Sequence, residues 1–345
     1  MQRYVTVLIP TIGRYNLLEY VLKGLKDQSF TDFDILLIVR PNDVETAKIA
    51  ERFNGSLDIK VVCQRKKGLI EAYNEGINNA EGEILVFLDD DAVPDPNCIV
   101  EHVLTYERLN VSGVSGDVIP AHISDGVLKP VHGSSEVVGF YKEPKILRMF
   151  GDKFWNCPLG GQEGYLAYIS KAGYSRKNIH LAHRGIVNSL LCMAANMSVL
   201  ASSVKDFQIP SSFLRRGIDF EQVLGWMLWK NGHKMVFNPM AKVYHVLHGQ
   251  SMSRLHSIEN VFRAIMEDEL VFYYLFLEGE NLSIKHRVVS SLFNTLVHLK
   301  KVSENWRYEL AILKGILFGN LTGLKWVVSR KFGGSYMPIQ DALFK

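Results

Sequence analysis

The sequence has 345 residues, of which 47% are hydrophobic and 22% charged, a balance typical of a globular protein with one large domain or two smaller ones. Its net charge of +3 is too small to indicate nucleic-acid binding by itself. The charge is uneven, because residues 285–345 carry ten Lys or Arg against three Asp or Glu, a balance of +7 that leaves −4 for the first 284 residues.

The four cysteines, Cys63, Cys98, Cys157 and Cys192, are scattered without the short spacing of a zinc site. They are expected to be reduced thiols in the core of a cytoplasmic protein. A strand is predicted at the start of the sequence, so we expect no signal peptide. No run of 18 or more uncharged apolar residues is present, so we expect no membrane-spanning helix.

The first third of the sequence alternates predicted strands with predicted helices. Repeated strand–helix units predict a parallel sheet with helices on both faces. We expect strands over residues 4–9, 34–39, 59–63 and 84–88, and helices over residues 15–28, 43–53, 68–79 and 97–109.

The fourth predicted strand leads directly into three aspartates. Ile84–Leu88 is an unbroken apolar run, typical of a strand that is covered on both faces, and Pro94 ends the extended segment. Asp89, Asp90 and Asp91 then repel one another at the carboxyl end of this strand. A divalent cation would relieve the repulsion, because hard cations bind carboxylate oxygens. A solvated acidic turn is the alternative interpretation.

Polar residues follow two other predicted strands at the same edge. Pro10 and Thr11 follow the first strand, and Arg40–Asp43 follows the second. In parallel α/β sheets, ligands bind beyond the carboxyl ends of the strands. We therefore expect these loops and the three aspartates to form one site.

The second half of the chain is less regular between residues 111 and 200. A helix is predicted over residues 217–232, with Asp219 and Glu221 near its start and Gly232 as its C-cap. Two short strands are expected after it, over residues 234–237 and 241–245.

The region from residue 260 onward is predicted to be helical and amphipathic. Gly315, Gly319 and Gly323 recur every four residues, a pattern that permits close helix packing. Packing on the domain is the favoured interpretation, and contact with a membrane surface is the alternative. One apolar stripe is formed by Leu310, Leu313, Leu317, Leu321 and Leu324.

Six segments resemble, in order, the family 2 glycosyltransferases of GT-A fold, over roughly residues 4 to 250. They are Val7–Thr11; Gly68-Leu69 with Ala72, Asn74, Gly76 and Gly82-Glu83; Phe87–Asp91 with Pro94; Asn196-Met197-Ser198, which resembles an acceptor-side segment; Gly217-Ile218-Asp219; and Val243-Tyr244-His245.

The resemblance implies an α/β GT-A fold, a Rossmann-like and mostly parallel sheet flanked by helices, with a C-terminal helical extension. Residues 1–110 are expected to be the nucleotide-sugar-binding half and residues 111–255 the acceptor-binding and catalytic half. Residues 256–345 would form the amphipathic helical region.

The resemblance also implies inverting transfer of a sugar from a nucleotide-diphosphate sugar to an acceptor hydroxyl. Asp91 is expected to contact Mg²⁺ or Mn²⁺, which neutralises the leaving diphosphate, while Asp89 contacts the ribose or the metal. His245 either completes the metal shell or is a core histidine, and His248 is a weaker candidate. Asp219 matches the family's catalytic base, and Glu221 is the reserve.

The resemblance implies a nucleotide-sugar site with one notable departure. Arg40 stands where many members have an aspartate that reads the base, and a guanidinium cannot accept a hydrogen bond from uracil. Either Asn42 or Asp43 substitutes, or the base is not uracil. The nucleotide-sugar candidates are Pro10, Thr11, Arg14, Arg40, Asn42, Asp43, Gly68, Asn74, Asp89 and Asp90.

Two other functions are weighed against this one. A catalytically inactive GT-A scaffold or sugar-binding protein is favoured by Arg40 and by Ile218, which replaces a family glutamate. A sugar nucleotidyltransferase is disfavoured by the poor phosphate loop at Thr11–Arg14. The absence of a Q-x-x-R-W motif predicts addition of single sugars. The expected partners are a glycan or lipid-linked acceptor, without nucleic acid, at the cytoplasmic face of a membrane if the C-terminal helices contact lipid.

Overall fold

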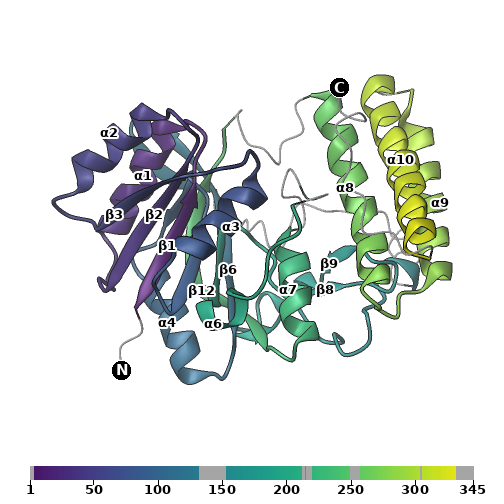
Figure 1. The fold of residues 1–345 in the computed structure, drawn as a ribbon, viewed down its shortest axis with the longest axis horizontal. Helices are drawn as coiled ribbons and strands as arrows, with labels where there is room; N and C mark the ends of the chain where they lie inside the picture. The colour runs from purple at the N-terminus through teal and green to yellow at the C-terminus, as the bar shows by residue number, and fades with distance from the viewer. Residues whose placement is uncertain are drawn as a thin grey trace.

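The computed structural model describes residues 4–131, 153–211, 214, 220–248, 257–303 and 305–331. Its centre is a ten-stranded sheet in the order β10-β12-β6-β11-β4-β1-β2-β3, with β5 paired to β12 and β7 paired to β6 (Figure 1). The strands are β1 (Val5–Pro10), β2 (Phe33–Val39), β3 (Ile59–Cys63), β4 (Ile84–Leu88), β5 (Ala92–Pro94), β6 (Gly113–Ser124), β7 (Val127–Pro130), β10 (Val187–Asn188), β11 (Asn196–Leu200) and β12 (Met235–Val246).

The first four strands are parallel and confirm the predicted strand–helix units. β4, β1, β2 and β3 are neighbours in that order, so their carboxyl ends share one edge. This sheet flanked by helices confirms the predicted α/β fold class.

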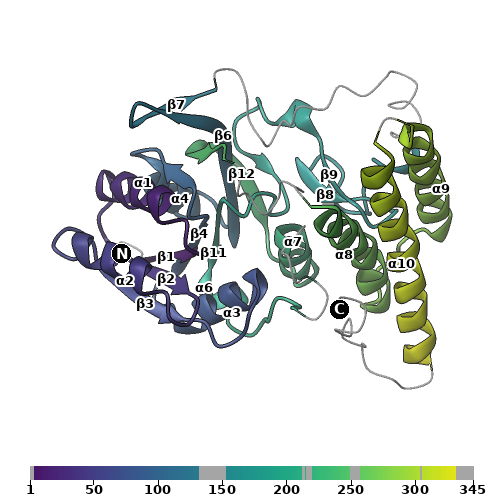
Figure 2. The same cartoon turned by 90° about the horizontal axis from the view of Figure 1, so that it is seen from above.

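The helices cover both faces of the sheet because successive strand residues point to opposite sides. In β4, Ile84, Val86 and Leu88 join the core under one helical layer, whereas Leu85 and Phe87 join the core under the other. Figure 2 shows α1 and α4 on one side of the sheet and α3 on the other. The first layer is α1 (Tyr15–Lys26), α2 (Val44–Phe53) and α4 (Cys98–Arg108), and the second is α3 (Leu69–Asn79), α6 (Ala201–Val204) and α7 (Phe220–Lys230).

The predicted irregularity of residues 111–200 is only partly correct. β6 is a 12-residue strand that runs parallel to β12 in the middle of the sheet. Its sequence contains two glycines and a proline, which hide its strand pattern. This region also contributes β7, β10 and β11 to the main sheet. It further contains the small sheet of β8 (Ala167–Ile169) and β9 (Ser175–Lys177), and a short helix, η1 (Ile179–Leu181).

Two further expectations are corrected. The two strands predicted over residues 234–237 and 241–245 are one strand, β12, whose register shifts between Asn238 and Lys242. Cys63 is exposed, so it is not a core thiol, whereas Cys98 and Cys192 are buried.

Gly232 follows α7 at a φ of +83°, as its predicted role as a C-cap requires.

Three helices form the end of the molecule opposite β3 and α2 (Figures 1 and 2). They are α8 (Ile258–Leu277), α9 (Ile284–Lys301) and α10 (Trp306–Lys331). α10 packs on α8 through its glycines, as the spacing predicted: a Cβ on Gly319 would lie 2.6 Å from Glu269 Cβ, and one on Gly323 would lie 2.0 Å from the Tyr273 ring. By length and composition alone, α10 could cross a membrane.

Candidate active site

The three aspartates lie where β4 ends, at the carboxyl edge of the parallel strands. Asp90 and Asp91 are 0% and 1% exposed, so they do not form a solvated acidic turn. Asp89 is half-buried, and its carbonyl accepts a hydrogen bond from Ala92 N at 3.1 Å. Burying neighbouring carboxylates requires compensating positive charges or hydrogen-bond donors.

Strand pairing brings a histidine to Asp91 from 154 residues further along the chain. β5 follows the aspartates directly and pairs with β12, so that His245 lies opposite Ala92. Val246 N donates to the Asp91 carbonyl at 2.9 Å, which fixes this register. As a result, His245 Nε2 lies 3.2 Å from Asp91 Oδ1, so these two predicted metal ligands are neighbours.

The other Asp91 oxygen is held by two further side chains. His248 Nε2 lies 2.6 Å from Asp91 Oδ2, and Arg14 Nη1 lies 2.5 Å from the same atom. Arg14 also forms an ion pair with Asp90, which accepts a hydrogen bond from Thr11 Oγ1 at 2.7 Å. The loop after β1 therefore meets the loop after β4, as predicted.

The two buried aspartates respond differently to this environment. Burial raises the pKa of Asp90 to about 6, against the opposing effects of the Arg14 charge and the Thr11 hydroxyl. Burial acts in the same direction on Asp91, but the contacts of its oxygens with His245 and His248 and the Arg14 charge outweigh it and hold the Asp91 pKa below its usual range. Asp91 is therefore ionised at neutral pH.

The third carboxylate is linked to α3 and α7. Tyr73 OH donates to Asp89 Oδ1 at 3.2 Å, and burial together with the neighbouring Asp91 raises the pKa of Asp89. The Tyr73 ring stacks on Phe220 with 4.8 Å between ring centroids. Phe220 begins α7, so this stack places the start of α7 beside the aspartates.

Glu221 lies in the first turn of α7. Burial raises its pKa to about 7, and the nearby Asp89 charge adds to the increase while Lys177 opposes it. A carboxylate with this pKa changes its charge near neutral pH. Asp219 and the rest of its Gly217-Ile218-Asp219 segment lie outside the described residues.

Asp89, Asp91 and His245 offer three ligand atoms that all lie within 4.8 Å of one another. Asp91 Oδ1 is buried and accepts no hydrogen bond of good geometry from the described residues, whereas Oδ2 is occupied by Arg14 and His248. Two carboxylate oxygens and an imidazole nitrogen suit Mn²⁺ and related divalent ions. The residues therefore fit a divalent metal.

The remaining nucleotide-sugar candidates have different surroundings. Asn74 is buried, and its side-chain amide exchanges two 2.9 Å hydrogen bonds with the backbone of Ile209. Asp43 caps α2 by accepting from Thr46 N at 3.1 Å. Arg40 and Asn42 are exposed after β2, and Gly68 precedes α3 at a φ of +129°.

Asn196 and Ser198 lie in the core of the sheet. Both are 0% exposed within β11, which runs antiparallel between β4 and β6. His102 of α4 lies 2.9 Å from each of their side-chain oxygens. The resemblance of this segment to an acceptor-side motif therefore corresponds to a buried polar network in the core.

Sequence reasoning missed three features of the site. All three join residues that are not neighbours in the sequence. They are the ion pairs of Arg14 with Asp90 and Asp91, the contact of His248 with Asp91, and the Tyr73–Asp89 hydrogen bond. The sequence itself showed only that Arg14 follows one predicted strand and that His248 follows a later one.

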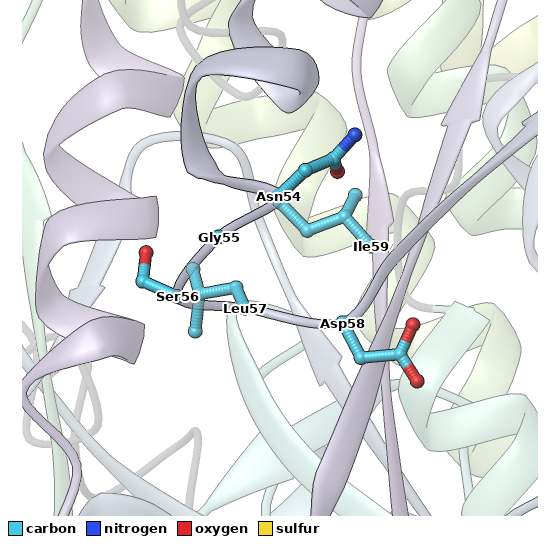
Figure 3. Close-up of a pocket in the computed structure, with 6 residues that line it drawn as sticks. All are labelled: Asn54, Gly55, Ser56, Leu57, Asp58 and Ile59. Atoms are coloured by element: carbon cyan, nitrogen blue, oxygen red, sulfur yellow. The ribbon is translucent and has the colours of Figure 1, made fainter.

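The surface pocket formed by residues 54–59 does not contribute to this site (Figure 3). It lies in the loop that enters β3 from α2, and thus at the edge of the sheet opposite the aspartates.

A sequence model of glycosyl transferase family 2 matches residues 6–175, a segment that contains all three aspartates. This part of the chain belongs to glycosyl transferase family 2. The family 2 domain also resembles curated proteins that are named as glycosyltransferases.

Two of these relatives act on lipid-linked sugars, according to their names. The dolichyl N-acetyl-alpha-D-glucosaminyl phosphate 3-beta-D-2,3-diacetamido-2,3-dideoxy-beta-D-glucuronosyltransferase of Methanococcus voltae is 22% identical over 171 residues, covering 44% of this chain and 53% of the relative. The GalNAc(5)-diNAcBac-PP-undecaprenol beta-1,3-glucosyltransferase of Campylobacter jejuni is 32% identical over 89 residues, covering 25% and 29%. The matches thus span about half or less of the relatives' lengths.

The fold extends the similarity beyond the matched segment. A mannosyltransferase from Pyrobaculum calidifontis, solved with GDP-Man and Mn²⁺, superposes with a TM-score of 0.53 at 11% identity, over 94% of this chain and 88% of the other. At this identity, the similarity establishes the fold of the family 2 domain and its extension.

Proposed function

We propose that the protein is an inverting glycosyltransferase that moves one sugar from a nucleotide-diphosphate sugar to a hydroxyl of a glycan or lipid-linked saccharide. The observation that carries the proposal is the cluster of Asp89, Asp91 and His245 at the carboxyl edge of the sheet, with Asp91 fully buried. In α/β sheets, this edge is where nucleotides bind.

Asp89, Asp91 and His245 would hold a divalent cation, Mg²⁺ or Mn²⁺. Such an ion, when bound, supplies positive charge that stabilises the leaving nucleoside diphosphate. The Mn²⁺ in the related mannosyltransferase structure supports this assignment. Arg14 and His248 keep the Asp91 carboxylate ionised and oriented, because both contact its Oδ2 atom.

Arg14 adds a second positive charge at the same place. Its guanidinium is shared between Asp90 and Asp91, and a guanidinium binds phosphate oxygens as readily as carboxylates. Thr11, Arg14 and Asp90 would therefore line the donor site, with Pro10 at the end of β1.

The loops after β2 and β3 lie at the same edge and would contact the nucleoside. Their candidate residues are Arg40, Asn42, Asp43 and Gly68. Asn74 would act indirectly, by fixing Ile209 against α3.

The acceptor proton would be removed by a carboxylate at the start of α7. We assign this role to Asp219 from the family resemblance, with Glu221 as the second candidate. The position is supported by Phe220, which stacks on Tyr73 beside Asp89 and so brings this segment to the metal-binding side chains. A base here would face the sugar from the acceptor side, as inversion requires.

A hydrolysis and transfer assay tests the proposal. Purified protein is incubated with UDP-, GDP-, dTDP- and CMP-linked sugars, with Mn²⁺ or with EDTA, and release of the free nucleotide is measured. We expect release from one donor class only, dependent on metal, and lowered about a hundredfold or more in Asp91→Asn because the loss of a metal ligand removes charge stabilisation.

The matched control is Asp58→Asn, an exposed aspartate at the opposite edge of the sheet. It should retain wild-type activity. Absence of turnover with every donor, in protein that is folded and metal-loaded, would instead support a non-catalytic sugar-binding protein.

A further inference from the structure

The outer sides of α9 and α10 carry a concentration of exposed apolar side chains. Twelve of the 21 large hydrophobic side chains that are exposed among the described residues lie on these two helices. We call these twelve the outer surface. They are Ile284, Val288, Leu292, Leu296 and Leu299 of α9, and Trp306, Leu310, Leu317, Phe318, Leu321, Leu324 and Val328 of α10.

The exposure is not a by-product of loose packing. Most of the outer surface follows spacings of three, four and seven residues along each helix, which places the side chains on one face. The opposite face of α10 is closely packed, because Gly315, Gly319 and Gly323 lie against α8. The leucine stripe, apart from the half-buried Leu313, therefore lies on the solvent side, while the helix packs on the domain through its glycines.

The inner sides of α9 and α10 are fixed to the protein by polar contacts. Arg287 of α9 forms a buried ion pair with Glu269 of α8, and Asn320 of α10 donates to the same carboxylate at 2.7 Å. His298 and Glu309 join α9 to α10 at 2.6 Å. The two helices thus have a defined orientation, with their apolar stripes directed away from the domain.

The charges on these helices have one sign. Every exposed charged side chain that the structure describes on α9 and α10 is basic, and the acidic Glu309 is buried against His298. Arg307 also stacks on the exposed Trp306 ring at 5.2 Å from its centroid. The exposed cations are Lys285, Lys301, Arg307, Lys314, Lys325, Arg330 and Lys331.

This charge selects the occupant of the surface. A second copy of the chain would place cations against cations, which opposes association through the same face. An anionic lipid bilayer complements both properties, because its acyl region accepts the leucines and its head groups attract the lysines. We propose that the outer surface of α9 and α10 binds an anionic membrane surface.

The helices would lie along the membrane and not cross it. α10 is long enough to span a bilayer, but its glycine face stays against α8, which carries the buried Glu269. Lys314 and Lys325 interrupt the apolar stripe at its flank and can extend to the head groups. This is the pattern of an amphipathic interfacial helix.

The biological sense of this surface rests on the proposed function, because a transferase that acts on lipid-linked saccharides needs access to a membrane. The two relatives named for lipid-linked substrates support this reading. The surface itself lies on helices distinct from the aspartate site, so the two proposals can fail independently.

Co-sedimentation with vesicles tests the inference. The full chain is mixed with vesicles of phosphatidylcholine alone, or with vesicles in which a third of the lipid is phosphatidylglycerol. We expect binding to the anionic vesicles that weakens with salt. The triple variant Leu317→Gln/Leu321→Gln/Leu324→Gln should lower it by about tenfold or more, since each leucine transfers apolar area into the lipid.

The electrostatic part is tested by Lys314→Gln/Lys325→Gln. Each lysine near an anionic surface contributes about 1 kcal/mol, which is about a fivefold change in binding, so the pair should lower affinity about 25-fold. Lys26→Gln/Lys205→Gln is the matched charge control, and Val44→Gln/Met240→Gln is the matched apolar control. Both controls should bind vesicles like the wild type.

Two results would overturn the inference. One is the absence of anionic-vesicle binding by the wild-type chain. The other is a dimer that the triple leucine variant converts to a monomer in light scattering, with vesicle binding unchanged. Asp91→Asn should bind vesicles normally, whereas the leucine variant should keep metal-dependent donor binding, so failure of either proposal can be recognised separately.

Discussion

Arg14 organises the aspartates at the end of β4. It forms ion pairs with Asp90 and Asp91, and Thr11 and His248 complete their hydrogen bonding. The sequence could predict that three adjacent carboxylates need positive charge, because that follows from Coulomb repulsion alone. It could not predict which charge, because the partners come from loops after different strands.

We expect the two carboxylates next to Phe220 in the sequence, Asp219 and Glu221, to have separable effects on activity. Asp219→Asn should lower kcat by about 10²–10⁴, the usual contribution of a general base, whereas Glu221→Gln should retain most of kcat. Because the pKa of Glu221 is raised to about 7, wild-type kcat/KM should rise through pH 7 as this group ionises. Glu221→Gln should lose that rise and keep kcat/KM near its low-pH value, because a neutral glutamine resembles the protonated carboxyl.

Initial rates from pH 5.5 to 9 in the two variants provide the measurement. The control is Asp206→Asn, because Asp206 is an exposed carboxylate outside the site. If Glu221→Gln loses more kcat than Asp219→Asn, the base is Glu221 and our assignment is wrong.

His102 should make the protein sensitive to acid. It is 0% exposed between Asn196 and Ser198, and burial lowers its pKa from 6.5 to about 4. A group with a depressed folded-state pKa takes up protons more readily when unfolded. Its contribution to stability is therefore fully present above pH 6.5 and is lost as the pH falls towards 4. At pH 4.5, the loss amounts to about 2–3 kcal/mol of the free energy of unfolding.

Urea unfolding of the wild type and His102→Gln at pH 7.5 and pH 4.5 tests this expectation. Glutamine can donate to one neighbour and accept from the other, so the variant should lose less stability on acidification. The exposed His122→Gln should behave like the wild type. Equal acid sensitivity of His102→Gln and the wild type would show that His102 does not carry the effect.

At the scale of elements, α10 shows why periodicity alone does not assign a buried face. Its sequence has two candidate stripes, one of leucines and one of glycines, and hydrophobicity favours burying the leucines. The glycines are buried because they allow α8 to approach, and Glu269 and Tyr273 fill the space that side chains on α10 would need. The leucines are exposed as a consequence.

The attachment of these helices depends on one buried ion pair. Arg287 binds Glu269, and Tyr174 and Asn320 also donate to that carboxylate. Arg287→Met should lower the free energy of unfolding by about 3–5 kcal/mol, because it leaves the Glu269 carboxylate buried without its cation. Arg287→Met/Glu269→Leu should recover part of that loss.

The matched control is Arg263→Met, since Arg263 forms an ion pair with the exposed Glu259 on α8. Exposed pairs contribute about 0–1 kcal/mol, so this change should be small. Equal losses for the two arginine variants in urea unfolding would contradict a special role of the buried pair.

At the scale of the whole molecule, the sequence predicts the strands and helices of residues 1–110 better than the rest. β1 to β4 are uninterrupted apolar runs with clear boundaries, and their parallel order follows from the intervening helices. β6, with its glycines and proline, was missed, although it pairs with β12 to form the middle of the sheet. The pairing of β5 with β12 that delivers His245 is a long-range contact that no local pattern reveals.

The measurement that tests the central claim most directly is a thermal shift with nucleotide sugars, each with and without Mn²⁺. A donor at a hundredfold excess over its dissociation constant should stabilise the folded protein by about 2.7 kcal/mol, or about 4 °C in Tm for a chain of this length. We predict such a shift for one nucleotide, only with metal, and none in Asp91→Asn. A shift that is independent of metal and unchanged in Asp91→Asn would contradict a donor site built on the three aspartates.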